Sequence, residues 1–340
     1  MNLLPFVSII IPCYNEEKYI VQCLDSIVAG DYPLEKMEVL VVDGRSTDQT
    51  RHLLADYSLR HPVVKMVDNP HRLKPQALNI GIKMSKGDII IRMDAHALYD
   101  KSYVSKSVKY LEEQNGDNVG GFLVTLPDGE GHIAKTIAYA MSNNFGVGNS
   151  TFRTGANECR WVDTVFGGCY RREIFEKIGL FNEALVRGQD REFNIRLQKA
   201  GGKILFAPDI ICHYYARGTL RSYVPWFYSA GLTPFFISRL IGKKIFSWRN
   251  LVPPMFVLSL IILPLLSLLH PIFLLVFGVE MFTYLACAVI VATPVVKREK
   301  DFRFLISMPF IFVLTHVVYG AGALMGLFKP VKDSGEWTKV

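Results

Sequence analysis

Polar and apolar positions alternate along this chain in long blocks. In the first hundred residues, three runs of branched apolar residues each stop at a polar tip: "VSIIIPCYNEE" at 7–17, "EVLVVDGRSTDQT" at 38–50 and "DIIIRMDAH" at 88–96. A parallel strand that is buried on both faces has this pattern. We therefore predict strands near 6–11, 38–42, 63–67 and 88–93.

Amphipathic stretches lie between these runs and predict helices at 16–29, 48–60 and 75–85. Asn15 is placed to cap the first helix, and Asp48 to cap the second. Regular alternation of strands with helices indicates βαβ units. We therefore expect an α/β fold with a mostly parallel sheet.

The chain becomes less regular after this region. Gly, Asn and Asp cluster between 115 and 160, which predicts long loops above a site. Beyond them we expect a strand over 160–172 that ends in a double glycine, and then a helix from 172 to 178. A helix at 188–202 and a strand at 203–209 complete the globular part.

A different composition follows. Aromatic residues mix with Arg and Lys over 219–249, a combination that favours helices at the bilayer interface, although an aromatic core helix would share it. Residues 251–296 carry one formal charge, Glu280. This run fits two membrane spans of about 20 residues each, divided at His270 and Pro271.

A third apolar stretch covers 304–327, and small residues near its end allow close helix contact. If this stretch also spans, the chain ends outside the cell, unless the stretch is re-entrant. Glu280 and His316 fall inside the predicted spans, where ionisable groups are costly. They are either functional or hydrogen-bonded to each other.

These patterns divide the chain into four segments. We predict a cytosolic globular domain at 1–217, interfacial amphipathic helices at 218–250, two to three transmembrane helices at 251–328 and a tail at 329–340. The N-terminus does not resemble a signal peptide, because no Lys or Arg precedes its apolar stretch. The six cysteines lack CxxC spacing, which indicates reduced thiols rather than zinc ligands or disulfides.

The net charge of +7 supports a membrane partner rather than nucleic acid. Much of the basic excess borders the apolar run, with Arg249 before it and "KREKDFR" at 297–303 after it. Bases at the ends of spans mark the cytoplasmic side and attract anionic headgroups. We expect no nucleic-acid partner, because the bases are not interleaved with aromatic residues on a strand and no nucleic-acid motif occurs.

Candidate chemistry lies where the predicted strands end. Ligands of open α/β sheets bind outside the carboxyl ends of the strands, so the polar tips should meet on one rim. The side chains expected there are Asn15, Asp43, Asp48, Asp94 and His96. So many carboxylates require positive charge, which a divalent cation bound with a sugar-nucleotide diphosphate would bring.

Four blocks in sequence resemble one family. "VSIIIPCYNEE", "VVDGRSTDQT", "ALNIGI" and "DREFNIRLQKAGGKI" are similar in order and spacing to the inverting family 2 glycosyltransferases of the A-type fold, over roughly residues 5–215. The branch that the chain resembles is the succinoglycan-type glucosyltransferases. This resemblance implies a Rossmann-like A-type glycosyltransferase domain.

The resemblance also implies a donor site. In similar enzymes the carboxylate at the position of Asp43 accepts hydrogen bonds from the uracil or ribose of a UDP-sugar. Lys74 lies in a loop that could touch phosphate or be surface charge, and Arg217 lies where the family places a base against the diphosphate. The neighbouring wall is formed by Pro12, Tyr14, Asn15 and Glu17.

At the metal position the chain has Asp94, Ala95 and His96, where related enzymes have Asp-x-Asp. The resemblance implies Mn²⁺ or Mg²⁺ held by Asp94 and His96. Mg²⁺ prefers oxygen ligands whereas imidazole suits Mn²⁺ better, so His96 leaves the identity of the metal open. His96 is a metal ligand or phosphate contact in this interpretation, and a structural hydrogen-bonding residue in the alternative.

Asp190 is the candidate catalytic base. Inverting transfer needs one carboxylate to take the proton of the acceptor hydroxyl, and Asp190 opens a helix as the base of the family does. Gln189 stands where the family has Glu. Gly167 and Gly168 resemble the strand-end loop where the acceptor sugar approaches in this family, and the resemblance implies that Asp163 orients the loop.

The predicted function is therefore metal-dependent inverting transfer from a nucleotide sugar, first of all a UDP-sugar, to a lipid-linked or polyprenyl-linked saccharide. The catalytic domain would face the cytoplasm, and a multi-pass anchor would lie in the cell (inner) membrane. Two alternatives remain open: a polyprenyl-phosphate glycosyltransferase, and a catalytically weak scaffold of a polysaccharide-assembly complex. The donor sugar, the linkage and the oligomeric state are open.

Overall fold

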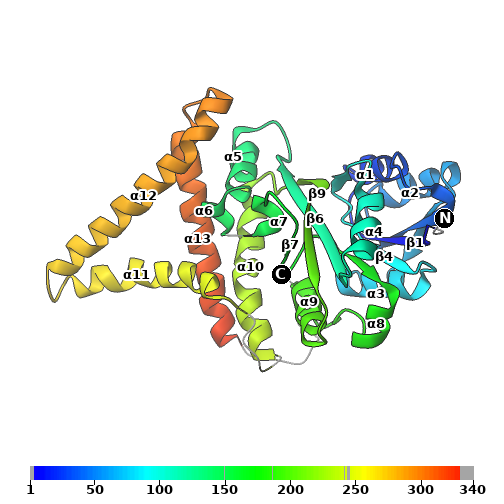
Figure 1. The fold of residues 1–340 in the computed structure, drawn as a ribbon. Coiled ribbons are helices and arrows are strands. Elements are labelled where there is room, and N and C mark those ends of the chain that lie inside the picture. Colours follow the sequence, from blue (N-terminus) through cyan, green and yellow to red (C-terminus); the bar gives the residue numbers. More distant parts are fainter. Residues whose placement is uncertain (1–3, 149, 186, 241, 243–245, 330–340) are drawn as a thin grey trace. The chain divides into compact units, whose positions relative to one another are not determined.

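The structure is a computed structural model that describes residues 4–148, 150–185, 187–240, 242 and 246–329. The chain forms two compact units (Figure 1). An α/β unit contains residues up to Val124 together with Thr151–Tyr215. A helical unit contains Thr125–Ser150 together with the described residues from Ala216 to Lys329. The segment boundaries predicted at 217, 250 and 328 stay a prediction.

The first half of the sheet is parallel, as the apolar runs predict. Its strands follow the order β3-β2-β1-β4, and neighbouring strands pair in parallel. The strands are β1 (Val7–Cys13), β2 (Met37–Asp43), β3 (Val64–Asp68) and β4 (Ile89–Arg92). Between them come α1 (Ile20–Val28), η1 (Leu34–Lys36), α2 (Thr50–Arg60) and α3 (Lys74–Met84). Each predicted strand and helix of this half is present within a few residues.

Antiparallel strands extend the sheet beyond β4. They follow in the order β8-β6-β9-β5, and β7 pairs with β9. The strands are β5 (Ala97–Tyr99), β6 (Asn118–Leu126), β7 (Arg160–Trp161), β8 (Cys169–Arg171) and β9 (Ile204–Tyr215). The helices of this half are α4 (Tyr103–Glu113), α7 (Thr151–Thr154), α8 (Arg172–Ile178) and α9 (Gln189–Lys199).

Apolar side chains from the two faces of the sheet form two separate cores. Ile9 and Ile11 belong to the core that includes residues of α1, α2 and α4, whereas Ile10 belongs to the core with α3, α8 and α9. Successive side chains of a strand point to opposite faces, so a run of branched apolar residues contributes to both cores. This two-sided burial confirms an α/β fold and explains why apolar residues dominate β1, β2 and β4.

Two predictions about the middle of the chain are wrong. Residues 115–160 are not mainly loops: they contain β6 and α7 together with α5 (His132–Met141) and α6 (Asn144–Val147). The glycines of β6 serve close packing, because a Cβ at Gly120 would come 2.6 Å from Val165, and one at Gly121 would overlap the carbonyl of Ile210. The single strand predicted over 160–172 is two short strands, β7 and β8.

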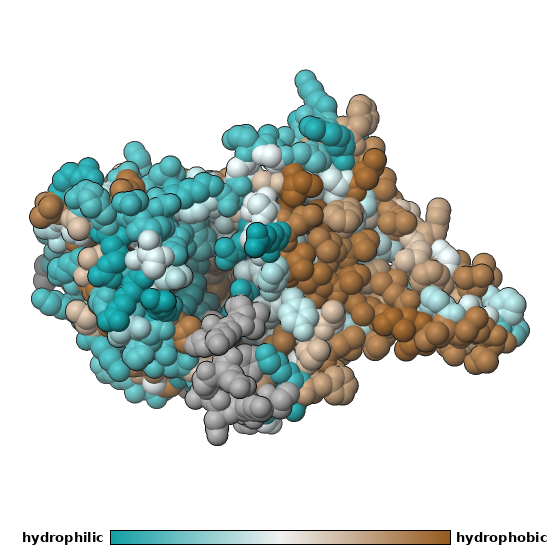
Figure 2. Space-filling view, turned by 180° about the vertical axis from the view of Figure 1, so that it is seen from behind, coloured by the Kyte–Doolittle hydropathy of each residue, from teal (hydrophilic) through white to brown (hydrophobic). Residues whose placement is uncertain are grey.

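The helical unit contains α5, α6 and the remaining helices of the chain. These are α10 (Leu220–Leu240), η2 (Trp248–Leu251), α11 (Val252–Leu266), α12 (Ile272–Glu299) and α13 (Phe304–Phe328). Within the described residues, three helical segments are long and apolar enough to cross a membrane: Trp248–Leu266, Ile272–Glu299 and Phe304–Phe328. They coincide with the predicted spans, and hydrophobic residues dominate the surface of this region (Figure 2).

Glu280 and His316 do not bond to each other, contrary to one prediction. Ser259 in α11 donates to Glu280 Oε1 at 2.6 Å, and the Tyr284 hydroxyl lies 2.7 Å from His316 Nδ1. Each ionisable group therefore has a partner on a neighbouring helix. Such pairing satisfies polar groups that would be costly if left alone in an apolar helix bundle.

Candidate active site

Acidic residues end the parallel strands at one edge of the sheet. Cys13 of β1 lies opposite Asp43 of β2, which in turn lies opposite Asp68 of β3. Arg92 ends β4 on the other side of β1, and Asp94 follows two residues later. Parallel strands bring their carboxyl ends to one edge. The structure therefore places Asp43 and Asp94 on the rim where the sequence predicts them.

Arg92 links Asp94 to Asp190. Its guanidinium, with the side chain only 5% exposed, lies 3.0 Å from Asp94 Oδ1 through NH2 and 3.1 Å from Asp190 Oδ2 through NH1. Lys74, at the start of α3, approaches Asp94 Oδ1 to 2.6 Å. Burial alone would raise the pKa of Asp94, but Arg92 and Lys74 hold that pKa well below its usual range. Asp94 is therefore ionised at any ordinary pH.

The two carboxylate oxygens of Asp190 differ, because Arg92 binds one of them and the other has no partner among the described residues. Its Oδ1 is buried and has no hydrogen-bond partner in the part of the chain that the structure describes, while Oδ2 faces Arg92. The side chain as a whole is 30% exposed, in the first turn of α9. Gly188, the residue before α9, has φ +76°, which permits the turn into the helix. A buried carboxylate oxygen without a partner is rare and calls for a functional explanation.

The predicted acceptor loop lies beside Arg92. The backbone N–H of Arg92 donates to the Gly168 carbonyl at 2.9 Å, and its NH1 lies 3.5 Å from the Gly167 carbonyl. Both glycines have positive φ, and a Cβ on Gly167 would come 2.9 Å from the Arg92 carbonyl. Gln189 is buried at the start of α9, whereas Asp163 is exposed on the segment between β7 and β8.

His96 already has two partners. Its Nδ1 lies 2.8 Å from Glu16 Oε1, and its Nε2 lies 3.0 Å from the Tyr214 hydroxyl. Burial lowers the pKa of His96, but Tyr214, Glu16 and Asp94 outweigh burial and raise that pKa to about 10. In this arrangement neither ring nitrogen is open to a metal ion. The role of His96 as a metal ligand stays a prediction.

Asp94 fits a cation that is shared with phosphate. In the described ranges, no group of three or more His, Cys, Asp or Glu side chains could hold a metal ion. Mg²⁺ in phosphate-transferring sites is commonly held by one or two carboxylates plus substrate phosphates, so a protein cage is not required. Asp94 Oδ1 is already paired with Arg92 and Lys74, so Asp94 would hold a cation through its other oxygen, and its role as a metal ligand stays a prediction.

The loop after β1 is tied to the loop after β2. Asn15 has φ +53°, and its Oδ1 accepts from the Thr47 backbone N–H at 2.8 Å. Glu17 Oε2 accepts from the Gln49 backbone N–H, also at 2.8 Å. The prediction that Asn15 caps the first helix is wrong, because α1 begins only at Ile20. The Asn15 side chain instead holds the two loops together.

The other predicted donor residues differ in exposure. Tyr14 is 43% exposed and Pro12 is half-buried, next to the strand end. Asp43 is fully buried, and its carboxylate accepts from Ser46 Oγ at 2.5 Å and Arg51 NH1 at 2.6 Å. Arg217 is exposed and belongs to the helical unit. Donor contacts by these residues stay a prediction.

The prediction that Asp48 caps the second helix is wrong in position, because the N-cap of α2 is Gln49 and Asp48 lies one residue before it. Its Oδ1 accepts from the Thr50 backbone N–H at 3.0 Å, at the first turn of α2, and its Oδ2 accepts from the Glu17 N–H at 3.3 Å. These bonds outweigh the effect of burial and lower the pKa of Asp48. The carboxylate is occupied by backbone and is not offered to a ligand.

Three residues of this site were not singled out from the sequence. Arg92 is an ionised residue at the end of an otherwise apolar strand, which is a detectable signal, but its partner Asp190 comes much later in the chain. Glu16 and Tyr214 carry no comparable signal in the sequence. Only the fold shows that both meet His96.

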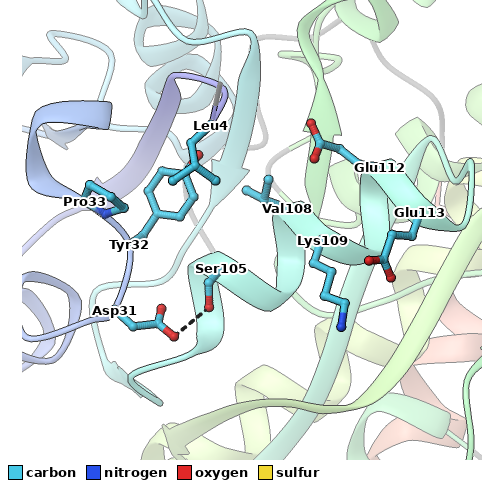
Figure 3. A pocket seen from close by; sticks show the side chains of 9 residues that line it. All are labelled: Leu4, Asp31, Tyr32, Pro33, Ser105, Val108, Lys109, Glu112 and Glu113. Atoms are coloured by element: carbon cyan, nitrogen blue, oxygen red, sulfur yellow. Dashed lines mark hydrogen bonds between the residues drawn. The ribbon is translucent and has the colours of Figure 1, made fainter. Parts of the chain in front are cut away.

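A separate hollow lies at the other end of the strands. It is bordered by Leu4 before β1, by Asp31, Tyr32 and Pro33 before β2, and by residues of α4 (Figure 3). Ser105 donates to Asp31 Oδ2 at 2.9 Å on its floor. Because these residues precede the strands, the hollow is on the edge opposite the acidic rim.

The family of the chain follows from comparison with known proteins. The model of the family described as Glycosyl transferase family 2 matches residues 8–179 of this chain. A relative from Methanococcus voltae is 30% identical over 332 residues, which are 95% of this chain and 98% of that protein. It is the dolichyl N-acetyl-alpha-D-glucosaminyl phosphate 3-beta-D-2,3-diacetamido-2,3-dideoxy-beta-D-glucuronosyltransferase. The chain belongs to glycosyl transferase family 2, and it is a glycosyltransferase.

Further comparisons confirm the predicted branch and fold. The succinoglycan biosynthesis protein ExoA of Rhizobium meliloti is 32% identical over 222 residues, 65% of each chain. The solved mannosyltransferase PcManGT of Pyrobaculum calidifontis, in complex with GDP-Man and Mn²⁺, gives a TM-score of 0.58 at 22% identity. That alignment covers 96% of this chain and 88% of the other, and it shows a common fold.

Proposed function

We propose that this protein transfers a sugar from a nucleotide sugar, first of all a UDP-sugar, to a lipid-linked saccharide at the cytoplasmic face of the membrane. The transfer inverts the anomeric centre and serves polysaccharide or glycoconjugate assembly. One observation carries the proposal: Arg92 gathers the carboxylates of Asp94 and Asp190, and Asp190 keeps one oxygen without a partner among the described residues.

In this reaction the acceptor hydroxyl oxygen bonds to the anomeric carbon, and the bond from that carbon to the nucleoside diphosphate breaks. Asp190 takes the hydroxyl proton on Oδ1. Arg92 holds Oδ2 and so fixes the direction in which Oδ1 points. A positioned base of this kind contributes a rate factor of about 10² to 10⁴. Gly167, Gly168, Gln189 and Asp163 would line the approach of the acceptor.

The departing diphosphate needs positive charge around it. A divalent cation on Asp94, Mn²⁺ or Mg²⁺, would neutralise the developing charge of the leaving group. Lys74 stands at the N-terminal end of α3, where the helix dipole also favours an anion. Arg92 and Lys74 keep the Asp94 carboxylate ionised and ready to hold the cation.

Two findings support a lipid-linked acceptor. The name of the Methanococcus voltae relative describes an acceptor that is a dolichyl-linked sugar phosphate. This chain also has three helical segments apolar enough to enter a membrane. An enzyme whose acceptor cannot leave the bilayer gains from being held there, because binding becomes a two-dimensional search at the membrane surface.

The proposal is tested with the purified full chain in liposomes. Labelled UDP- and GDP-sugars are offered together with a lipid extract that contains polyprenyl-linked saccharides, with Mn²⁺, with Mg²⁺ and with EDTA. We expect transfer from one sugar nucleotide to the lipid fraction, loss of that transfer in EDTA, and recovery when the cation is restored. Absence of transfer from every sugar nucleotide would contradict the proposal.

Product analysis separates the alternatives. A lipid that carries a single sugar on one phosphate would indicate a polyprenyl-phosphate glycosyltransferase, whose acceptor phosphate needs no strong base. Donor binding without turnover, measured as protection from thermal unfolding by the nucleotide sugar, would indicate a scaffold. A lengthened lipid-linked saccharide with inverted configuration at the new bond is the result that we expect.

A further inference from the structure

The three apolar segments of the helical unit are not equally exposed. In the most apolar stretch of Trp248–Leu266, 6% of the residues are buried, and the same share holds for Ile272–Glu299. In Phe304–Phe328 the share is 39%. The first two segments therefore offer nearly their whole surface to their surroundings, whereas α13 is covered by other parts of the unit over much of its length.

The first half of α13 is covered by α5 and α6. His132 Nε2 and the Thr136 hydroxyl lie 2.9 and 3.1 Å from the Ser307 hydroxyl, and the ring of Phe145 packs against Phe312. The chain leaves the α/β unit after Val124, contributes Thr125–Ser150 to the helical unit, and re-enters the α/β unit at Thr151. Crossing a bilayer twice would take two spans of about 20 residues, so α5 and α6 stay on the side of the α/β unit.

The rest of α13 is covered by α10, and the two helices run in the same direction. The hydroxyls of Tyr223 and Thr315 lie 2.6 Å apart, a Cβ on Gly322 would overlap the carbonyl of Tyr228, and Arg239 donates to the Lys329 carbonyl at 2.7 Å. Figure 1 shows the pair side by side. Yet α10 is not among the segments apolar enough to span, and it contains two internal prolines.

The two ends of the α11–α12 hairpin carry polar residues and lie near different points of α13. Next to the start of α11, Asn250 donates to the Tyr319 hydroxyl at 2.7 Å. The end of α12 carries Lys297 and Arg298, just before α13 begins at Phe304. An inserted hairpin has both polar ends at the same membrane surface. Because Phe304 and Tyr319 are about 22 Å apart along a helix, α13 must lie along that surface.

The tip of the hairpin has no charged residue to place in water. Residues 251–279 contain no Asp, Glu, Lys or Arg, and the tip residues Leu268 and Leu269 are 83% and 81% exposed. The Val257 side chain packs at Gly320 of α13. From Val257 to Leu266 the helix α11 rises about 14 Å, less than the roughly 30 Å of hydrocarbon in a bilayer, so α12, which is about 40 Å long, would have to run at a slant to the membrane normal. Hydrophobic residues dominate the face of this region that Figure 2 shows.

We propose that the α11–α12 hairpin enters the hydrocarbon of the bilayer without crossing it, and that α10 and α13 lie together in the interface. The protein is then anchored in one leaflet, and α13 ends on the same side of the membrane as the α/β unit. Tyr, Trp and Arg side chains of α10 and η2 suit the headgroup layer in this arrangement. The proposal is independent of the donor and the acceptor.

Cysteine labelling of the full chain in sealed liposomes tests the proposal. The background carries Cys159→Ser and Cys287→Ser, because these two cysteines are exposed and the other four are buried. Single cysteines are then introduced as Leu268→Cys at the tip, Phe328→Cys at the end of α13, and His52→Cys on α2 as the marker for the side of the α/β unit. A membrane-impermeant maleimide is applied to either side.

We expect His52→Cys and Phe328→Cys to react from the same side. Leu268→Cys should react from neither side in sealed vesicles, and fully after detergent is added. Reaction of Leu268→Cys from the side opposite His52→Cys would show a crossing hairpin, and reaction from the same side would show a hairpin outside the bilayer. Either result, or reaction of Phe328→Cys from the opposite side, overturns the proposal. Leu269→Cys replaces Leu268→Cys if the latter does not fold.

Discussion

At the scale of single residues, Arg92 is held between two carboxylates that a strand and a distant helix provide. Asp94 and Asp190 each use one oxygen to bind the guanidinium, and burial excludes most of the water that would otherwise separate these charges. A lysine offers one point charge on a flexible stem, whereas the planar guanidinium can hold two carboxylates in fixed directions. Arg92 therefore acts by positioning the candidate base.

We predict that Arg92→Met destabilises the fold by about 3 kcal/mol, because it removes the cation that Asp190 binds and leaves Asp94 with Lys74 alone. Arg92→Lys should regain much of that stability but little of the transfer rate, since one ammonium cannot hold both carboxylates. The measurements are chemical unfolding and the single-turnover transfer rate, with Arg60→Met on α2 as the control. Equal recovery of stability and rate by Arg92→Lys would contradict a positioning role.

Glu38 is a second buried charge, at the opposite end of the strands. It accepts from the Ser8 hydroxyl at 2.8 Å and from the Lys86 backbone N–H at 2.7 Å. Burial raises the pKa of Glu38, but these bonds and Lys65 lower it further than burial raises it. A carboxylate with a lowered pKa adds stability above its unfolded pKa, and this contribution is lost as the pH falls through the folded pKa.

Glu38→Gln should therefore cost about 1–3 kcal/mol at neutral pH, and the cost should shrink in acid below about pH 4.3. Unfolding by denaturant at pH 7 and at pH 3.5 measures both effects, with the exposed Glu35→Gln as the control. A cost that is the same at both pH values would show that the charge of Glu38 does not stabilise this end of the sheet.

At the scale of elements, the sequence predicts best where one physical cause dominates. The strands β1, β2 and β4 are buried on both faces, so apolar residues dominate their sequences, whereas the edge strand β3 has exposed residues. The region 115–160 was misread because Gly has two uses. The pair Gly120 and Gly121 suits a loop, but in β6 it provides room for Val165 and for the Ile210 backbone.

This use of glycine gives an element-scale prediction. Gly121→Ala should destabilise the α/β unit by at least about 1–3 kcal/mol, because the added methyl group overlaps the Ile210 carbonyl and β9 would have to move. Gly131→Ala is the matched control, since a Cβ there meets nothing within 4 Å. The measurement is the midpoint temperature of thermal unfolding of the two variants. Equal midpoints for Gly121→Ala and Gly131→Ala would mean that β6 and β9 are not packed this closely.

At the scale of the whole molecule, the sequence indicates that acidic residues from distant segments converge. For Asp94 and Asp190 the structure shows this convergence through Arg92. Asp43 shares the rim, but Ser46 and Arg51 enclose its carboxylate. The sequence could not reveal these partners, because a side chain's hydrogen bonds depend on loop geometry that residue spacing does not encode. Nor could it reveal that His96 binds Glu16 and Tyr214.

The most direct measurement of the central claim is the single-turnover rate of Asp190→Asn in liposomes, with the donor bound and the lipid-linked acceptor in excess. Asp56→Asn, an exposed site on α2, is the matched control. If Asp190 takes the proton of the acceptor, the rate of Asp190→Asn should fall by a factor of about 10² to 10⁴, with donor affinity little changed. A rate equal to that of Asp56→Asn would contradict the account.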